Sequence, residues 1–127
     1  MTQEEKMPVK NILVVDDSPT ERYFAVDLLT RAGYQVTTAE NGEEGIAKAK
    51  ALKPDLILMD VVMPGLNGYQ ATRTLTRDDE TKTIPIIVCT TKGQETDKIW
   101  GLRQGAVDYL VKPLNADELL QRIAALP

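Results

Sequence analysis

The sequence contains no histidine and only one cysteine, Cys89. Without histidine the chain has no imidazole for acid–base catalysis, for metal binding or for phosphorylation on nitrogen. A single cysteine excludes an internal disulfide and a zinc site built from several thiolates. The chemistry of any site in this chain therefore has to use carboxylates, hydroxyls, amines and backbone groups.

Long hydrophobic runs and excess positive charge are also missing. The longest unbroken apolar runs have four residues, as at 12–15, 56–59 and 86–89, which is too short for a membrane span or a signal peptide. Fifteen basic residues stand against nineteen acidic ones, a net charge of −4, so electrostatics favours neither nucleic acid nor an anionic membrane. We expect a cytoplasmic protein that neither inserts into membranes nor binds nucleic acid.

The chain has 127 residues, of which 43% are hydrophobic and 27% are charged, a balance typical of one globular domain. Residues 1–10 are polar and lack periodicity, so we expect a flexible N-terminal tail there and a single domain over 11–127. Because the chain ends directly after its last predicted helix, we expect no DNA-binding effector domain.

Short apolar segments alternate with segments of helical character from residue 12 onward. The predicted strands are 12–15, 34–38, 55–59, 84–89 and 107–111, and the predicted helices are 18–33, 41–52, 67–75, 94–104 and 115–126. Several of these strands are apolar throughout, which is typical of a parallel sheet covered by helices on both faces. Right-handed crossovers leave few arrangements for five such units, so we predict a doubly wound α/β fold.

The first predicted helix has a complete set of start signals. Ser18 can cap it, Pro19 suits its first turn, and Glu21 stands where a capping box places a glutamate. The sequence therefore predicts that the Glu21 carboxylate bonds back to the N–H of Ser18.

Trp100 is the one tryptophan, and it fits poorly on the helix predicted over 94–104. Ile99 and Leu102 are expected to face the core there, and Trp100 lies roughly 200° from Leu102 around the helix axis. Two interpretations stay open: a half-buried packing residue, or a contact for a protein partner alongside Lys98.

Polar side chains follow four of the five predicted strands. In a doubly wound sheet, functional groups gather at the carboxyl ends of the strands. We therefore expect three carboxylates, a hydroxyl and an ammonium to converge there, from Asp16-Asp17, Asp60, Thr90-Thr91 and Lys112-Pro113. Each feature alone is an ordinary turn, cap or loop residue, but chance does not readily place all four in this order.

Such a crevice has a specific chemistry. Three close carboxylates repel one another unless a cation compensates them, and Mg²⁺ is the best match for a set of hard oxygen ligands. Lys112 and Thr90 can donate to phosphoryl oxygens. Asp60 would then be a nucleophile that forms an aspartyl phosphate.

With these motifs the sequence resembles the receiver domains of two-component response regulators, the CheY-like superfamily, over about residues 11–126. The resemblance is carried by the segments 14–17, 59–60, 63–65, 90–91, 105–106 and 112–113, together with Gly68. It implies a flavodoxin-like sheet of five parallel strands in the order 2-1-3-4-5 with five helices.

The resemblance also implies a role for each site residue. Asp60 is the expected phosphoacceptor, Thr90 the switch hydroxyl, Tyr109 the aromatic switch, and Lys112 a phosphoryl contact whose bond to Pro113 is cis. The expected Mg²⁺ ligands are Asp16, Asp17, Asp60 and the backbone carbonyl of Val62, with Asp17 a more direct ligand than Asp16. Lys98, Trp100 and Tyr109 form the expected partner surface.

Partners follow from the same resemblance. A CheA-like histidine kinase is the expected phosphodonor, and the segments 16–21, 63–68, 70–73, 90–92 and 94–98 resemble single-domain receivers of the chemosensory systems that control type IV pili and twitching motility. A downstream motility or pilus protein is the expected target. We expect a monomer or a weak phosphorylation-dependent dimer, and no enzyme activity beyond the chain's own phosphorylation and dephosphorylation.

Other functions remain as alternatives. The chain could be a generic chemotaxis-type receiver or a phosphate sink of another phosphorelay. An aspartate-nucleophile phosphohydrolase usually has two acids separated by one residue after its first strand, whereas Asp16 and Asp17 are adjacent. A flavodoxin-like nucleotide binder needs a Gly/Ser/Thr-rich loop there, and the acids would repel a phosphate. Receivers usually have a smaller residue at the position of Thr91, and Val62 and Lys92 flank the site. The lifetime of the phosphate on Asp60 therefore stays open.

Overall fold

The computed structural model describes residues 9–126 as five β–α units around one parallel sheet. The elements are β1 (Asn11–Val15), α1 (Pro19–Arg31), β2 (Gln35–Ala39), α2 (Gly42–Leu52), β3 (Leu56–Met59), α3 (Gly68–Arg77), β4 (Ile86–Thr90), α4 (Glu95–Arg103), β5 (Asp108–Val111) and α5 (Ala116–Ala124). The strand order is β2-β1-β3-β4-β5, with every neighbouring pair parallel. The predicted doubly wound fold and its strand order are therefore confirmed.

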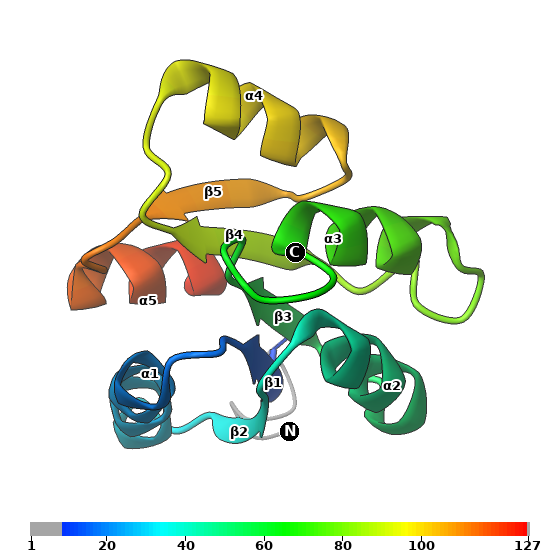
Figure 1. Cartoon of the computed structure of the whole chain (residues 1–127). Coiled ribbons are helices and arrows are strands. Elements are labelled where there is room, and N and C mark those ends of the chain that lie inside the picture. The colour runs from blue at the N-terminus through cyan, green and yellow to red at the C-terminus, as the bar shows by residue number, and fades with distance from the viewer. Residues whose placement is uncertain (1–8, 127) are drawn as a thin grey trace.

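Helices cover both faces of the sheet (Figure 1). α1 and α5 lie on one face, α2 and α3 on the other, and α4 lies beside β5. Every residue of the central strands β3 and β4 is buried, and so is all of β1 after its first residue. The edge strands β2 and β5 keep exposed positions. This burial explains why the central strands are continuous apolar runs in the sequence.

Two hydrophobic clusters hold these layers together. On one face α1 and α5 pack against alternate residues of β1, β3 and β4, through Ala25, Leu29, Leu119 and Ile123. On the other face α2 and α3 pack against the intervening residues, through Ala49, Ala71 and Leu75. Each fully buried Leu or Ile contributes about 1.5–3 kcal/mol relative to an exposed side chain. These clusters fix the strand ends on which any site must be built.

Four predicted strands begin too early, those predicted from residues 34, 55, 84 and 107, and backbone hydrogen bonding explains the first and the third. The N–H of Tyr34 donates to Leu29 O at 3.1 Å, in the turn that closes the end of α1, and is therefore not available to a neighbouring strand. Pro85 has no N–H, and although its carbonyl accepts from Ile57, the strand begins at Ile86 and extends to Thr90.

The last two residues of the predicted N-terminal tail, Val9 and Lys10, are described by the structure and contact the domain. Val9 is only 4% exposed and belongs to the cluster under α1 and α5. The N–H of Lys10 donates to the Asp55 carboxylate at 2.9 Å, and its carbonyl accepts from Gln35. Among the described residues hydrophobic burial thus includes Val9, and residues 1–8 lie outside the described part of the chain.

The predicted core stripe of α4 is wrong as well. Ile99 and Leu102 are 44% and 48% exposed, and Gly101 is the buried residue of this helix. A side chain at 101 would collide with the ring of Tyr109, so α4 approaches the sheet through its backbone and its larger apolar residues stay at the surface. Within residues 9–126, no helix combines the length and the hydrophobicity needed to cross a membrane.

Gly68 determines how the chain returns from β3 to α3. Its N–H donates to Val61 O at 3.0 Å, and a Cβ at this position would lie 1.9 Å from the carbonyl oxygen of Asp60. The loop that follows Asp60 therefore closes only over a residue without a side chain.

We predict that Gly68→Ala lowers the free energy of unfolding by about 2–4 kcal/mol, because backbone atoms cannot move aside as a flexible side chain can. Gly33→Ala is the control: its Cβ would meet nothing within 4 Å, and only its φ of +101° is unfavourable for alanine. That control should cost about 1 kcal/mol. Urea denaturation of both variants checks this, and equal losses would contradict it.

Candidate functional site

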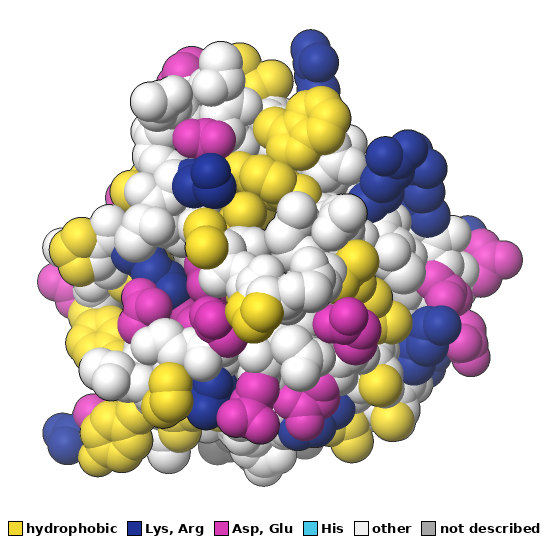
Figure 2. All heavy atoms as spheres, in the orientation of Figure 1, with side chains coloured by type: hydrophobic (Ala, Val, Ile, Leu, Met, Phe, Trp, Pro, Cys, Tyr) yellow, Lys and Arg dark blue, Asp and Glu magenta, His cyan; other side chains and the backbone are white. Residues whose placement is uncertain are grey.

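Three carboxylates meet at the carboxyl ends of β1 and β3. Val15 is paired with Met59, so the residues after them, Asp16 and Asp60, lie side by side, and the N–H of Asp60 donates to Val15 O at 3.0 Å. One carboxylate oxygen from each of Asp16, Asp17 and Asp60 lies within 4.8 Å of the others. Acidic side chains gather across the middle of the face shown in Figure 2. The predicted convergence of these acids is confirmed.

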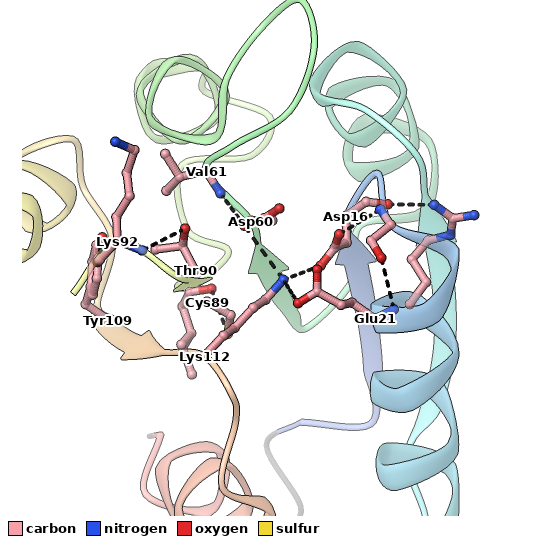
Figure 3. Close-up of polar contacts among 12 residues, drawn as sticks. Asp16, Glu21, Asp60, Val61, Cys89, Thr90, Lys92, Tyr109 and Lys112 are labelled. Atoms are coloured by element: carbon pink, nitrogen blue, oxygen red, sulfur yellow. Dashed lines mark hydrogen bonds and ion pairs between the residues drawn. The ribbon is translucent and has the colours of Figure 1, made fainter.

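Lys112 supplies the positive charge of this crevice. Its Nζ lies 2.6 Å from Asp16, 2.9 Å from Glu21 and 3.7 Å from Asp60, and its side chain is only 8% exposed (Figure 3). Burial lowers the pKa of Lys112, but its hydrogen bonds to Asp16 and Glu21, together with the negative charges of Asp60 and Asp16, outweigh burial and raise the pKa above its ordinary value. The ammonium therefore stays charged. The peptide bond from Lys112 to Pro113 is cis, as expected.

Glu21 belongs to this crevice and not to a capping box. Ser18 does cap α1, since its Oγ accepts from the Glu21 N–H at 3.3 Å. The N–H of Ser18, however, donates to Asp16 Oδ1 at 2.9 Å, which leaves the Glu21 carboxylate without its expected partner. It turns to Lys112 instead, because a charged hydrogen bond is stronger than a neutral one. The predicted capping box is therefore wrong.

The Asp60 carboxyl group is buried, and burial makes its ionised form unfavourable. It is 7% exposed, and its Oδ1 accepts from the N–H of Val61 at 2.9 Å. Burial raises its pKa from an ordinary 3.8 to about 6, against the lowering effect of Lys112 and with a further increase from Asp16. An apolar cavity of about 270 Å³ adjoins it, lined in part by Phe24, Leu58 and Leu114. Asp16, Glu21 and Lys112 also line this cavity, so Asp60 lies between an apolar wall and the charged groups of the crevice.

The donor set fits a hard divalent cation. The carboxylates of Asp16, Glu21 and Asp60 lie around the Lys112 ammonium, and Asp17 adds a fourth carboxylate beside Asp16 and Asp60. The oxygen ligands suit Mg²⁺ in charge and in chemistry. Cys89 is fully buried and burial raises its pKa to about 12, so it supplies no thiolate. The carbonyl of Val62, in the loop after β3, remains a prediction as the fourth ligand.

Thr90 and Tyr109 are joined through one loop residue. Thr90 is fully buried at the end of β4, beside Asp60 in Figure 3, and its Oγ1 accepts from the Lys92 N–H at 3.5 Å. The Tyr109 hydroxyl donates to the Lys92 carbonyl at 2.6 Å. Both predicted switch residues therefore contact the backbone of Lys92, although they come from different strands.

The predicted partner residues on α4 lie outside this crevice. Trp100 is 50% exposed and Lys98 is partly exposed on the same helix, whereas Tyr109 is buried with 7% exposed. Hydrophobic side chains lie over α4 at the top of Figure 2. About half of the Trp100 side chain is therefore available to a partner. Tyr109 lies beneath α4 and does not itself form part of the exposed partner surface.

Two residues were missed by sequence reasoning. Glu21 carries a start signal for a helix, which hid its contact with Lys112. The hydroxyl of Tyr69 lies 3.0 Å from that of Tyr109, forty positions away in the chain, and no local pattern indicates such a pair.

The raised pKa of Asp60 makes a prediction about stability. Without divalent metal, Asp60→Asn should raise the free energy of unfolding at neutral pH by about 1–2 kcal/mol, because it removes a buried charge. In the wild type, the stability linked to a protonated Asp60 is present below pH 3.8 and lost as the pH rises through about 6. The gain of the variant should therefore shrink as the pH falls across that window.

Urea denaturation over this pH range measures the difference between the two proteins. Asp79→Asn, a substitution of a 92%-exposed aspartate, is the matched control and should change little. A gain that does not vary with pH, or a loss at neutral pH, contradicts the prediction.

Known proteins are similar to this chain in sequence and in fold. Residues 12–124 match the response regulator receiver domain as a family. The chain is 60% identical to PilH of Pseudomonas aeruginosa over 115 residues, 91% of this chain and 95% of that protein. It spans about half the length of several transcriptional regulators that it also matches.

Solved structures agree with this relationship. CheY4 of Vibrio cholerae, a chemotaxis protein, superposes with a TM-score of 0.85 at 36% identity, covering 91% of this chain and 96% of that one. The receiver domain of a sensor histidine kinase from Pseudomonas aeruginosa, which holds a magnesium ion in its active-site cleft, superposes with a TM-score of 0.83 at 33% identity, covering 91% and 94%. This chain belongs to the response regulator receiver family.

Proposed function

We propose that the protein is a phosphorylation-operated switch that accepts a phosphoryl group on Asp60 from the phosphohistidine of a CheA-like kinase, with Mg²⁺ in the crevice. The observation that carries the proposal is the position of Asp60, buried beside Asp16 and Asp17 and 3.7 Å from the only lysine of the crevice among the described residues. The chain itself has no histidine, so a partner has to supply the phosphohistidine.

Transfer starts from the ionised Asp60. One of its oxygens attacks phosphorus and the bond between phosphorus and the imidazole nitrogen breaks. The imidazole leaves with the electron pair of that bond and keeps the proton already on its other ring nitrogen. Since the pKa of Asp60 is raised to about 6, the carboxylate is the predominant form at neutral pH and keeps more basicity than an ordinary aspartate. When bound by the three aspartates and the Val62 carbonyl, Mg²⁺ supplies charge neutralisation for the incoming phosphoryl group.

Lys112 and Thr90 hold the phosphoryl group after transfer. The ammonium of Lys112 already lies between Asp16 and Asp60, so phosphoryl oxygens can replace a carboxylate among its partners. The hydroxyl of Thr90 donates to another phosphoryl oxygen. When Thr90 moves toward the phosphoryl group, it displaces the loop at Lys92, with which its side chain is hydrogen-bonded. The Tyr109 hydroxyl contacts the same loop.

The output is a change of protein contacts over α4 and β5. Trp100, half exposed, and Lys98 on the same helix form the partner contact, and Tyr109 sets the position of α4 from beneath. Two states of this surface exchange, and the phosphoryl group favours one of them. The protein acts as a monomer or a weak phosphorylation-dependent dimer in the cytoplasm, and catalyses only its own phosphorylation and dephosphorylation.

The signalling system we propose is the chemosensory pathway of type IV pili. The identity of 60% to PilH over 95% of that protein supports this placement, in which the target is a motility or pilus protein. A phosphate sink or a receiver of another phosphorelay is the alternative, and a profile of phosphotransfer against all kinases of the host separates them. Rapid transfer from the pilus kinase alone supports our placement, and preference for another kinase overturns it.

The phosphoacceptor itself is tested by phosphotransfer from a labelled kinase. We predict that Asp60→Asn and removal of Mg²⁺ with EDTA each reduce incorporation at least a hundredfold, since the first removes the nucleophile and the second leaves the carboxylates uncompensated. Asp79→Asn, the same chemical change on an exposed loop, should transfer normally. Stable label at residue 60 in the Asp60→Asn protein is incompatible with the proposal.

The output surface is tested separately. We predict that Trp100→Ala abolishes complementation of twitching motility while phosphotransfer to Asp60 stays within about twofold of wild type, because half of the indole faces solvent away from the crevice. Tyr23→Ala removes an aromatic that is 75% exposed on α1 and should preserve both activities. Normal twitching with Trp100→Ala excludes this residue from the output contact.

A further inference from the structure

The geometry assigns a second tyrosine to the switch: Tyr69 is a positioning residue that ties Tyr109 to the backbone of α4, in a socket that depends on glycine at position 101. This inference rests on the proposed role of Tyr109 as the switch residue. It adds a residue from α3 to a device otherwise built from β4, β5 and the loop between β4 and α4.

Three hydrogen-bond contacts link the two tyrosines to that loop and to α4. The Tyr109 hydroxyl donates to Lys92 O at 2.6 Å. The Tyr69 and Tyr109 hydroxyl oxygens are 3.0 Å apart, and the Tyr69 hydroxyl lies 3.2 Å from Asp97 O on the first turn of α4. Tyr69 is thus placed between β5 and α4.

A count of hydrogens shows what Tyr69 does. Each phenol has one hydrogen to donate. Tyr109 uses its hydrogen for the short bond to Lys92 O, so in the contact between the tyrosines Tyr69 is the donor and Tyr109 the acceptor. The same hydrogen of Tyr69 also serves the carbonyl of Asp97. Tyr69 therefore shares its hydrogen between the switch residue and α4.

This sharing lets Tyr109 leave without stranding a buried donor. When Tyr109 turns outward, the hydrogen of Tyr69 passes wholly to Asp97 O, and a polar group that would otherwise lose its partner keeps one. When Tyr109 returns, its oxygen again finds a donor in surroundings that are otherwise apolar. Burial raises the pKa of both phenols, so both remain neutral donors.

The socket around Tyr109 is apolar apart from Tyr69. We use the term tyrosine socket for Val61, Val88, Ala106 and Gly101 together with Tyr69. A Cβ on Gly101 would lie 2.8 and 2.9 Å from two ring carbons of Tyr109, and 3.4 Å from the ring of Tyr69. The inward ring therefore occupies space that only glycine leaves free. The backbone of Gly101 lies in a helix, so alanine there obstructs the ring without straining the backbone.

Two substitutions separate the two parts of the socket. Tyr69→Phe keeps the ring and removes the shared hydrogen. Gly101→Ala keeps both hydroxyls and fills the space of the Tyr109 ring, while α4 gains a better helix former. Tyr34→Phe removes a phenol hydroxyl near the cluster under α1 and α5, and it is the matched control.

Fluorine NMR of the full chain labelled with 3-fluorotyrosine reads the position of Tyr109 directly. The chain has four tyrosines, and Tyr23, which is 75% exposed, provides the reference for a solvated ring. We expect the Tyr109 resonance to shift toward that of Tyr23 in Tyr69→Phe and further in Gly101→Ala, and to stay in place in Tyr34→Phe. A Tyr109 resonance at its wild-type position in both socket variants overturns the inference.

The same proteins are then titrated with beryllium fluoride in the presence of Mg²⁺, as a phosphoryl mimic, with the emission of Trp100 as the signal. Because coupling between sites is reciprocal, loss of the inward state should weaken apparent affinity for the mimic several-fold in both socket variants and leave Tyr34→Phe unchanged. Equal affinities in all proteins also overturn the inference. If the wild type itself gives no response that Asp60→Asn abolishes, the proposed phosphoacceptor function fails, whereas the fluorine result still decides the role of Tyr69.

Discussion

One lysine among four carboxylates is the constraint on which this molecule depends. Lys112 follows β5 at the edge of the sheet, yet its ammonium lies 2.6 Å from Asp16 at the end of β1. It reaches that position across the ends of β4 and β3, the two strands between them. Any change that moves β5 relative to β1 therefore leaves Asp16 and Asp60 without their common counter-ion.

The same crowding makes the crevice responsive. The carboxylates of the crevice carry more negative charge than one ammonium neutralises, so the site favours the binding of a cation. Asp60 is also harder to ionise than an ordinary aspartate. In the mechanism we propose, a phosphoryl group on Asp60 would add negative charge to this crowded site. Lys112 and Thr90 would then rearrange at little cost, because both already lie beside Asp60 and neither belongs to the hydrophobic clusters.

The sequence was informative wherever function follows from the order of the strands. Asp16, Asp17, Asp60 and Lys112 each follow a strand, and parallel strands bring their ends to one edge, so their meeting could be predicted from strand order alone. The limits of prediction lie where two local rules compete. Glu21 satisfied the pattern of a capping box, and only the position of Lys112 reveals the stronger partner.

Contacts between distant segments escaped prediction for a different reason. Ile99 and Leu102 have helical spacing typical of a core stripe, but the ring of Tyr109 already occupies the space beneath α4 and admits only Gly101. Tyr69 has no periodic signal at all, since its role depends on a partner forty positions away. Val9 joins the core because the Lys10 backbone accepts from Gln35 of β2 and donates to the Asp55 carboxylate, contacts that composition does not indicate.

The attachment of α4 through a glycine has a consequence for how the molecule opens. A helix that buries no large side chain of its own loses little hydrophobic free energy when it separates from the sheet, so its amide hydrogens exchange through local opening. The helices that carry Leu29, Leu75 and Leu119, each fully buried, open only with much more of the fold. The surface proposed to change in signalling thus lies on a helix of low local stability, and the chain can remodel it without approaching global unfolding.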